Sequence, residues 1–170
     1  PSITSTGGTA VDEDAAYSYS ITTSDDDSDS SDSWTISCTT CPSWLSVSHT
    51  AGASTATLSG TPLDANVGAN SVVISVADAA GATATESFTI TVANTNDAPT
   101  ISSTAVTSVD EDAAYSYTVT TADDDSDTVT LTGTTVPSWL TFTASTGVLA
   151  GTPLDANVGA NSVVITASDG

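Results

Sequence analysis

Apolar and polar residues alternate in short stretches along the whole chain, and Gly, Asp, Asn and Pro separate the stretches. The alternation is clearest in residues 83–92, where Phe88, Ile90 and Val92 fall on one side of an extended chain. Such period-two stretches, rich in Val, Ile, Thr and aromatic residues, indicate half-buried strands, and no stretch has the periodicity of a helix. In the first half of the chain the pattern predicts strands at residues 17–23, 34–38, 45–48, 55–59, 71–76 and 83–92.

Much of this pattern occurs twice. Residues 11–19 return at 109–117, residues 42–45 return at 137–140, and residues 60–74 return unchanged at 151–165. A period of roughly a hundred residues is too long for a solenoid unit and fits one sandwich-sized domain. We therefore predict an all-β protein of two tandem Greek-key β-sandwiches, repeat 1 at residues 1–98 and repeat 2 at residues 99–170, with a linker at residues 94–99.

The second repeat is predicted to lack its last strand. When Ala77 and Asp78 are aligned with Ser168 and Asp169, residues 79–92 have no counterpart. Three interpretations remain open. The sequence stops before the strand is reached; or a neighbouring chain donates the strand and so builds a filament; or the unit keeps an open edge that promotes aggregation.

The charge of the chain restricts its partners. It has 21 acidic residues, no Lys or Arg and one histidine, which gives a formal net charge of −21. Such a chain cannot neutralise phosphates, so we expect no nucleic-acid binding and no attraction to anionic membrane surfaces. No apolar run is long enough to span a bilayer, so direct membrane insertion is not expected. The favoured partners are cations, which would offset the self-repulsion of the folded chain.

The two cysteines, Cys38 and Cys41, predict a local disulfide. A redox CxxC motif and half of a zinc site are the alternatives, and His49 is the only further conventional zinc ligand that the sequence offers. Catalysis finds little support, because the sequence has neither a nucleophile elbow nor a phosphate-binding loop. We therefore expect a protein that is not an enzyme.

Acidic and amide residues gather at the turns between the predicted strands. The clusters are residues 12–14, 25–29, 64–66, 78 and 94–97, and the first four return at 110–112, 123–127, 155–157 and 169. Clustered carboxylates repel one another unless a cation binds them, and Ca²⁺ accepts six to eight oxygens in flexible geometry. Mg²⁺ fits less well because it requires a tighter octahedron. The alternative is that these acids are solvated turn residues.

Several of these motifs resemble, in order, those of the cadherin superfamily. Glu13 resembles an early calcium-binding Glu, residues 63–66 resemble Leu-Asp-Arg-Glu, residues 94–99 resemble the linker Asp-x-Asn-Asp-Asn-x-Pro, and Asp123-x-Asp125 resembles Asp-x-Asp. The closest resemblance is to the cadherin-like tandem repeats (dystroglycan-type or putative-immunoglobulin) of large bacterial surface adhesins, in which the Pro-Ser-Trp-Leu of residues 42–45 is typical. The resemblance implies immunoglobulin-like or cadherin-like sandwiches.

The resemblance also implies calcium between modules, with ligands from both. The matching inter-repeat positions are Glu13, Asp64, Asn96, Asp97, Asp123, Asp125 and Asp169. Half-sites toward neighbouring modules would use Asp25, Asp27 and Asp78 on one side and Glu111 and Asp155 on the other. Asn66 and Asn94 stand where the family pattern has acids, so fewer or weaker ions are expected.

Together these features predict a calcium-stiffened, extracellular structural repeat of a bacterial surface fibre or adhesin. Its partners would be neighbouring repeats of the same fibre, with surface glycans or proteins as further partners. One alternative is a filament subunit joined by donated strands. Another is a carbohydrate-binding module of a secreted protein, although Trp44 and Trp139 occur at the same place in both repeats and are expected in the cores.

Overall fold

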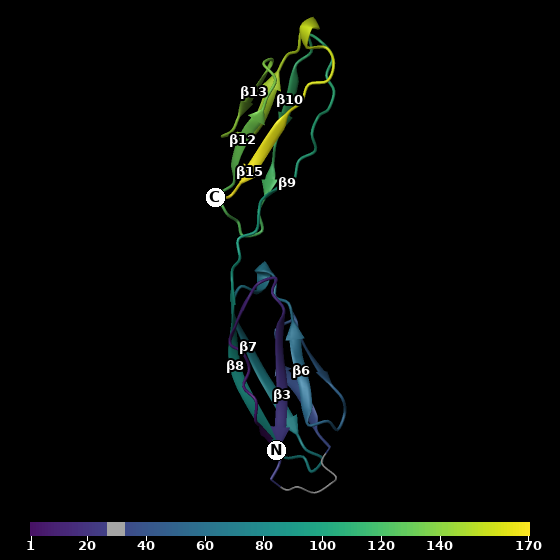
Figure 1. Cartoon of the computed structure of the whole chain (residues 1–170), viewed down its shortest axis with the longest axis vertical. Coiled ribbons are helices and arrows are strands. Elements are labelled where there is room, and N and C mark those ends of the chain that lie inside the picture. Colours follow the sequence, from purple (N-terminus) through teal and green to yellow (C-terminus); the bar gives the residue numbers. More distant parts are fainter. Residues whose placement is uncertain (27–32) are drawn as a thin grey trace. The chain divides into compact units, whose positions relative to one another are not determined.

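The computed structural model describes residues 1–26 and 33–170 and is built almost entirely of β-strands (Figure 1). The chain forms two compact units, Pro1–Thr95 and Asn96–Gly170, here called unit 1 and unit 2. Among the described residues no helix is long and apolar enough to cross a membrane. The prediction of an all-β, two-domain tandem is confirmed.

Unit 1 is a sandwich of two four-stranded sheets. One sheet has the order β1-β3-β6-β5 and the other β2-β8-β7-β4. The strands are β1 (Ser2–Ile3), β2 (Ala10–Asp12), β3 (Tyr17–Ser24), β4 (Thr35–Thr40), β5 (Leu45–His49), β6 (Thr55–Gly60), β7 (Gly68–Ala77) and β8 (Thr83–Ala93), with a 3-10 turn η1 at Asp64–Asn66. All six predicted strands are present, and β7 is the one that extends furthest beyond its predicted ends.

The core of unit 1 lies between its two sheets. Ile21 and Leu58 face inward from one sheet, and Ile74 and Ile90 face inward from the other; all four are fully buried. The inward positions alternate along each strand because successive side chains point to opposite faces of a sheet. The alternation seen in the sequence is therefore the signature of this two-layer core.

Unit 2 repeats the plan with shorter strands. They are β9 (Thr100–Ile101), β10 (Tyr115–Thr118), β11 (Thr121–Ala122), β12 (Thr130–Thr135), β13 (Leu140–Thr143), β14 (Val148–Gly151) and β15 (Val164–Ser168), with a 3-10 turn η2 at Asp155–Asn157. The sheets are β10-β14-β13, β12-β15 and the small pair β11-β9. The strand β15, yellow in Figure 1, pairs with β12 only, so its second edge has no partner strand among the described residues. The given sequence ends before a segment that would correspond to β8.

A tryptophan occupies the same place in both units. Trp44 meets the ring of Tyr17 edge-on with centroids 6.0 Å apart, and its Nε1 donates to Asn70 Oδ1 at 3.0 Å. Trp139 repeats both contacts with Tyr115 and Asn161, at 6.0 Å and 3.0 Å. Each indole therefore braces a turn against the sandwich.

A disulfide joins Cys38 and Cys41 in unit 1, at the end of β4. His49 on β5 contacts the Ala53 carbonyl oxygen at 3.0 Å through Nε2. Since both sulfurs are in the disulfide, they are not zinc ligands in this structure.

Candidate metal centre

Among the acids of unit 1 that the structure describes, only Glu13 is buried, with 2% of its surface exposed. Its backbone N–H donates to the Ala93 carbonyl at 2.9 Å, and its Oε1 accepts the N–H of Thr95 at 2.6 Å. The carboxylate therefore holds the chain where β8 ends and the linker begins. Asp14, in the left-handed region at φ 57°, turns the backbone so that its N–H reaches the Pro62 carbonyl at 2.8 Å.

This turn brings Asp64 to the same end of unit 1. Asp64 is the first residue of η1, and its carboxylate oxygen lies within 4.8 Å of a Glu13 carboxylate oxygen. The side chain of Asn66 is engaged elsewhere, because its Oδ1 accepts the Leu63 N–H at 2.9 Å. The end of unit 1 thus presents two carboxylates, Glu13 and Asp64, beside the start of the linker.

The start of unit 2 is held in a similar way. The N–H of Asp97 donates to Asp125 Oδ2 at 2.6 Å, and the Asn96 side-chain amide donates to Asp169 Oδ2 at 2.8 Å. Four of the predicted ligands therefore meet in two pairs, each joining the linker to a turn of unit 2.

A second cluster forms within the acidic turn that follows β11. Carboxylate oxygens of Asp123, Asp125 and Asp127 lie within 4.8 Å of one another. The turn is closed by the Asp127 N–H, which donates to Asp123 Oδ1 at 3.0 Å. Asp123 Oδ2 and Asp125 Oδ1 are shielded from solvent and accept no hydrogen bond from any described residue. Burying carboxylate oxygens in this way costs free energy unless a cation binds them.

Two residues of this turn were missing from the predicted ligand set. Asp127 completes the cluster because Ser126, at φ 62°, reverses the chain. Asp124 places a carboxylate oxygen within 4.8 Å of Asp97. The signal that could have identified Asp127 is the Asp-x-x-Ser-Asp spacing, since Asp side chains commonly cap a turn of this length.

The remaining predicted half-site residues are dispersed. Asp25 forms an ion pair with the amino group of Pro1 at 3.3 Å, and Asp78 Oδ1 accepts the Ala82 N–H at 2.9 Å in a hairpin turn. Asp27 lies outside the described residues. Glu111 and Asp155, at the positions of unit 2 that match Glu13 and Asp64, are both exposed.

The donor set decides which ion these residues could hold. It consists of carboxylate and amide oxygens, some of them shielded, and the chain has no Lys or Arg to offset them. Hard cations with high coordination numbers fit such ligands, so calcium fits better than zinc.

The fold defines a class of protein, a tandem of immunoglobulin-like β-sandwiches. Within this class the chain belongs to the family described as "Putative Ig domain", whose profile matches residues 1–93 and 98–170. No curated protein sequence matches the chain.

Solved structures that are similar to this chain include a hydrolase, a titin fragment and a cadherin fragment. The endo-fucoidan hydrolase MfFcnA4 of glycoside hydrolase family 107 is 26% identical with a TM-score of 0.44, over 96% of this chain and 26% of that chain. This chain thus spans about a quarter of that hydrolase. Titin domains Z1Z2 (in complex with telethonin) are 11% identical, with a TM-score of 0.44, over 98% of this chain and 92% of theirs. Chicken VE-cadherin EC1-2 is 18% identical, with a TM-score of 0.39, over 94% and 87%.

Proposed function

We propose that the chain is a non-catalytic, extracellular structural repeat of a surface fibre or adhesin, and that calcium at the linker stiffens it. The observation that carries the proposal is that an acid of each unit binds the linker backbone. Glu13 accepts the Thr95 N–H, and Asp125 accepts the Asp97 N–H. The linker therefore starts and ends on acidic groups that a cation could bind together.

Covalent geometry supports the same site. Thr95 and Asp97 are two residues apart, so their Cα atoms are at most ~7 Å apart. Carboxylates that bind the backbone at these two points can be bridged by one or more Ca²⁺ ions. On this proposal Glu13 and Asp64 of unit 1 and Asp97, Asp123 and Asp125 of unit 2 supply oxygens.

The stabilisation expected from the ion is modest. Extracellular calcium modules bind with dissociation constants of about 10⁻⁴–10⁻³ M. At about 1 mM calcium, mass action then stabilises the folded chain by ~0.4–1.4 kcal/mol per site. Calcium would therefore change stiffness and protease resistance more than it decides folding. A chain without Lys or Arg also offers trypsin no cleavage site, which suits exposure outside the cell.

A calcium titration by calorimetry tests the proposal. Wild-type chain should bind calcium saturably in the millimolar range, and the double variant Asp123→Asn and Asp125→Asn should lose most of that heat. Asp26→Asn is the matched control, because it removes one exposed acid from unit 1 and should leave the isotherm unchanged. Binding that is equal in all three chains, or no binding at 10 mM calcium, would contradict the proposal.

A separate measurement tests whether calcium stiffens the linker. Two spin labels, one on an exposed strand position of each unit, report the distribution of distances between the units. Calcium should narrow that distribution in the wild-type chain and leave it broad in the double variant. A distribution that does not change with calcium would separate simple ion binding from the proposed mechanical role.

A further inference from the structure

The Cys38–Cys41 disulfide lies where the chain crosses from one sheet of unit 1 to the other. Cys38 belongs to β4 and is half-buried against the core, whereas Cys41 is exposed in the segment that leads to β5. Both cysteines also line an open groove of about 490 Å³ between β4 and β5. A thiol in solution can therefore reach this disulfide while the unit is folded.

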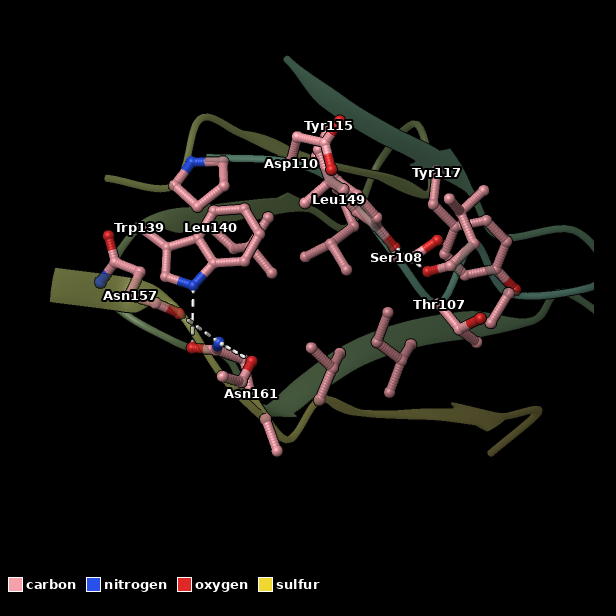
Figure 2. Close-up of a pocket in the computed structure, with 18 of the residues that line it drawn as sticks. Thr107, Ser108, Asp110, Tyr115, Tyr117, Trp139, Leu140, Leu149, Asn157 and Asn161 are labelled. Atoms are coloured by element: carbon pink, nitrogen blue, oxygen red, sulfur yellow. Dashed lines mark hydrogen bonds between the residues drawn. The ribbon is translucent and has the colours of Figure 1, made fainter. Parts of the chain in front are cut away.

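Unit 2 makes the same crossing without a disulfide, with Gly133 and Val136 in place of the two cysteines. The four residues that follow are identical, 42–45 in one unit and 137–140 in the other. In each unit the fourth of these residues donates its N–H to the carbonyl of the first, at 3.0 Å and 2.9 Å. Figure 2 shows Trp139 of this turn with its hydrogen bond to an asparagine side chain. The turn itself therefore forms without the disulfide.

Side-chain packing closes the crossing in unit 2. A Cβ built on Gly133 would lie 2.8 Å from Cγ2 of Val136 and 3.1 Å from Cδ1 of Phe142, so these two side chains occupy the space above the glycine. Unit 1 has the two cysteines and Val47 at the three matching positions. Because valine is smaller than phenylalanine, the same space in unit 1 accommodates the two sulfurs. Unit 1 thus has a covalent bond at a place where unit 2 has apolar contacts.

We propose that the Cys38–Cys41 disulfide is a redox-sensitive clasp, which an external dithiol opens in the folded protein. Opening it makes the stability of unit 1, but not that of unit 2, depend on the redox conditions. The closed loop stabilises unit 1 by restricting its unfolded chain, and reduction removes this restriction. The reduced thiols do not replace it, because unit 1 lacks the packing that Val136 and Phe142 provide in unit 2. No acid of the candidate metal centre takes part, so the inference is independent of calcium binding.

The chemistry is a thiol–disulfide exchange in two steps. A thiolate of the dithiol attacks Sγ of Cys41, the more exposed of the two cysteines, and Cys38 leaves as a thiolate that takes a proton from water. The second thiol of the reductant then loses its proton and attacks the reductant sulfur of the mixed disulfide, which releases Cys41 as a thiolate. The chain gains two electrons, and the dithiol is oxidised to its own disulfide.

The rate of reduction tests whether the clasp opens in the folded protein. The whole 170-residue chain is treated with dithiothreitol, and free thiols are alkylated and counted by mass spectrometry. The folded chain should be reduced at a rate within about tenfold of that of an oxidised peptide of residues 36–43, because access limits exchange. A rate no faster than the global unfolding of unit 1, measured by amide exchange, would overturn the proposal.

The melting temperature of each unit, followed by its own NMR signals, tests what opening the clasp does. Complete reduction should lower the melting temperature of unit 1 by about 10 °C and leave that of unit 2 unchanged. The double variant Cys38→Ser and Cys41→Ser should melt at the lower temperature with and without dithiothreitol. A melting temperature of unit 1 that is unchanged by complete reduction, or an equal fall in both units, would contradict the proposal.

A triple variant transfers the closure of unit 2 into unit 1. It carries Cys38→Gly, Cys41→Val and Val47→Phe, and it should recover about half or more of the lost melting temperature, because cores accept simultaneous changes that conserve volume. Its melting temperature should not respond to dithiothreitol. The double serine variant is the matched control, since it removes the disulfide and supplies no apolar contact. A triple variant no more stable than this control would show that the two closures are not equivalent and would overturn that part of the inference.

Discussion

Unit 1 and unit 2 contain an identical fifteen-residue segment, residues 60–74 and 151–165, that folds differently in each. In unit 1 the strand β7 begins at Gly68 and has ten residues. In unit 2 the equivalent strand β15 begins only at Val164 and has five. Since the residues are the same, the difference comes from their partners: β7 lies between β4 and β8, and β15 pairs with β12 alone.

The two equivalent acids give the same contrast. Glu13 is buried where β8 ends and the linker begins, with Ala93 at the end of β8 and Thr95 in the linker as its partners. Glu111, in the same sequence context, is exposed. A strand partner thus determines both the length of its neighbour and the environment of an acid at the end of the sandwich. Three pairs of substitutions and one pH titration test this contrast, beginning with the largest expected effect.

The largest difference is expected for Ile74→Ala and Ile165→Ala. Ile74 is fully buried, so its truncation should lower the free energy of unfolding of unit 1 by about 2–5 kcal/mol. Ile165 is only half-buried, so its truncation in this chain should cost less than about half as much in unit 2. Residue-resolved amide exchange by NMR reports each unit separately. Equal losses would show that Ile165 is packed as tightly in solution as Ile74.

Glycine substitutions should affect both units alike. A Cβ on Gly60 would overlap the Trp44 carbonyl, and a Cβ on Gly151 would overlap the Trp139 carbonyl. Because backbone must move in both cases, Gly60→Ala and Gly151→Ala should each cost about 3 kcal/mol in their own unit. The same exchange experiment measures them. A loss confined to unit 1 would mean that the Trp139 turn is already displaced in solution.

Removing the two tyrosine hydroxyls should again destabilise unit 1 more than unit 2, with a smaller difference in the free energy of unfolding. Tyr19→Phe removes a hydrogen bond to the carboxylate of Glu86, which should cost unit 1 about 2 kcal/mol. Tyr117→Phe removes contacts to Ser103 only and should cost unit 2 about 1 kcal/mol. Thermal unfolding followed by NMR signals of each unit measures both. A larger loss in unit 2 would contradict the hydrogen bonds that these two hydroxyls form in the structure.

The smallest effect concerns pH. Burial, and then the hydrogen bond to Glu86, raise the pKa of Tyr19 from its ordinary value of 10.0 to about 12. A raised pKa in the folded state means that the stabilisation is complete below pH 10 and is lost as the pH rises toward 12. The melting temperature of unit 1 should fall across this window while tyrosinate absorption at 295 nm rises. Tyr19→Phe should flatten the fall, and an unchanged slope would exclude this residue as its source.

Much of the fold follows from local sequence. All six strands that the period-two pattern predicted in unit 1 are present in the structure. The pattern works because the two faces of a half-buried strand differ in polarity, and this difference is visible residue by residue. The strand ends were harder. Residues 68–70 lack a strong apolar alternation and become part of β7 because β8 pairs with them. The local sequence pattern does not predict pairing with a segment that is distant along the chain.

The candidate metal centre could likewise be predicted from the sequence only in part. The acidic motifs and their order can be read directly from the sequence. Their resemblance to cadherin motifs predicted Glu13, Asp64, Asp97, Asp123 and Asp125 as ligands. The contribution of Asp127 was not visible, because it depends on a chain reversal at Ser126. Nor was the role of Glu13 in holding the linker, which requires β8 to run beside β2.

The sequence by itself determined the number of repeats, the two-layer β architecture and the acidic character of the turns, since these depend on composition and on patterns within about ten residues. Only the tertiary structure decided which residues of two identical segments are buried and which acids bind backbone. The physical reason is that burial and hydrogen bonding belong to pairs of segments, and a strand that is the same in sequence acquires a different environment when its neighbour is absent.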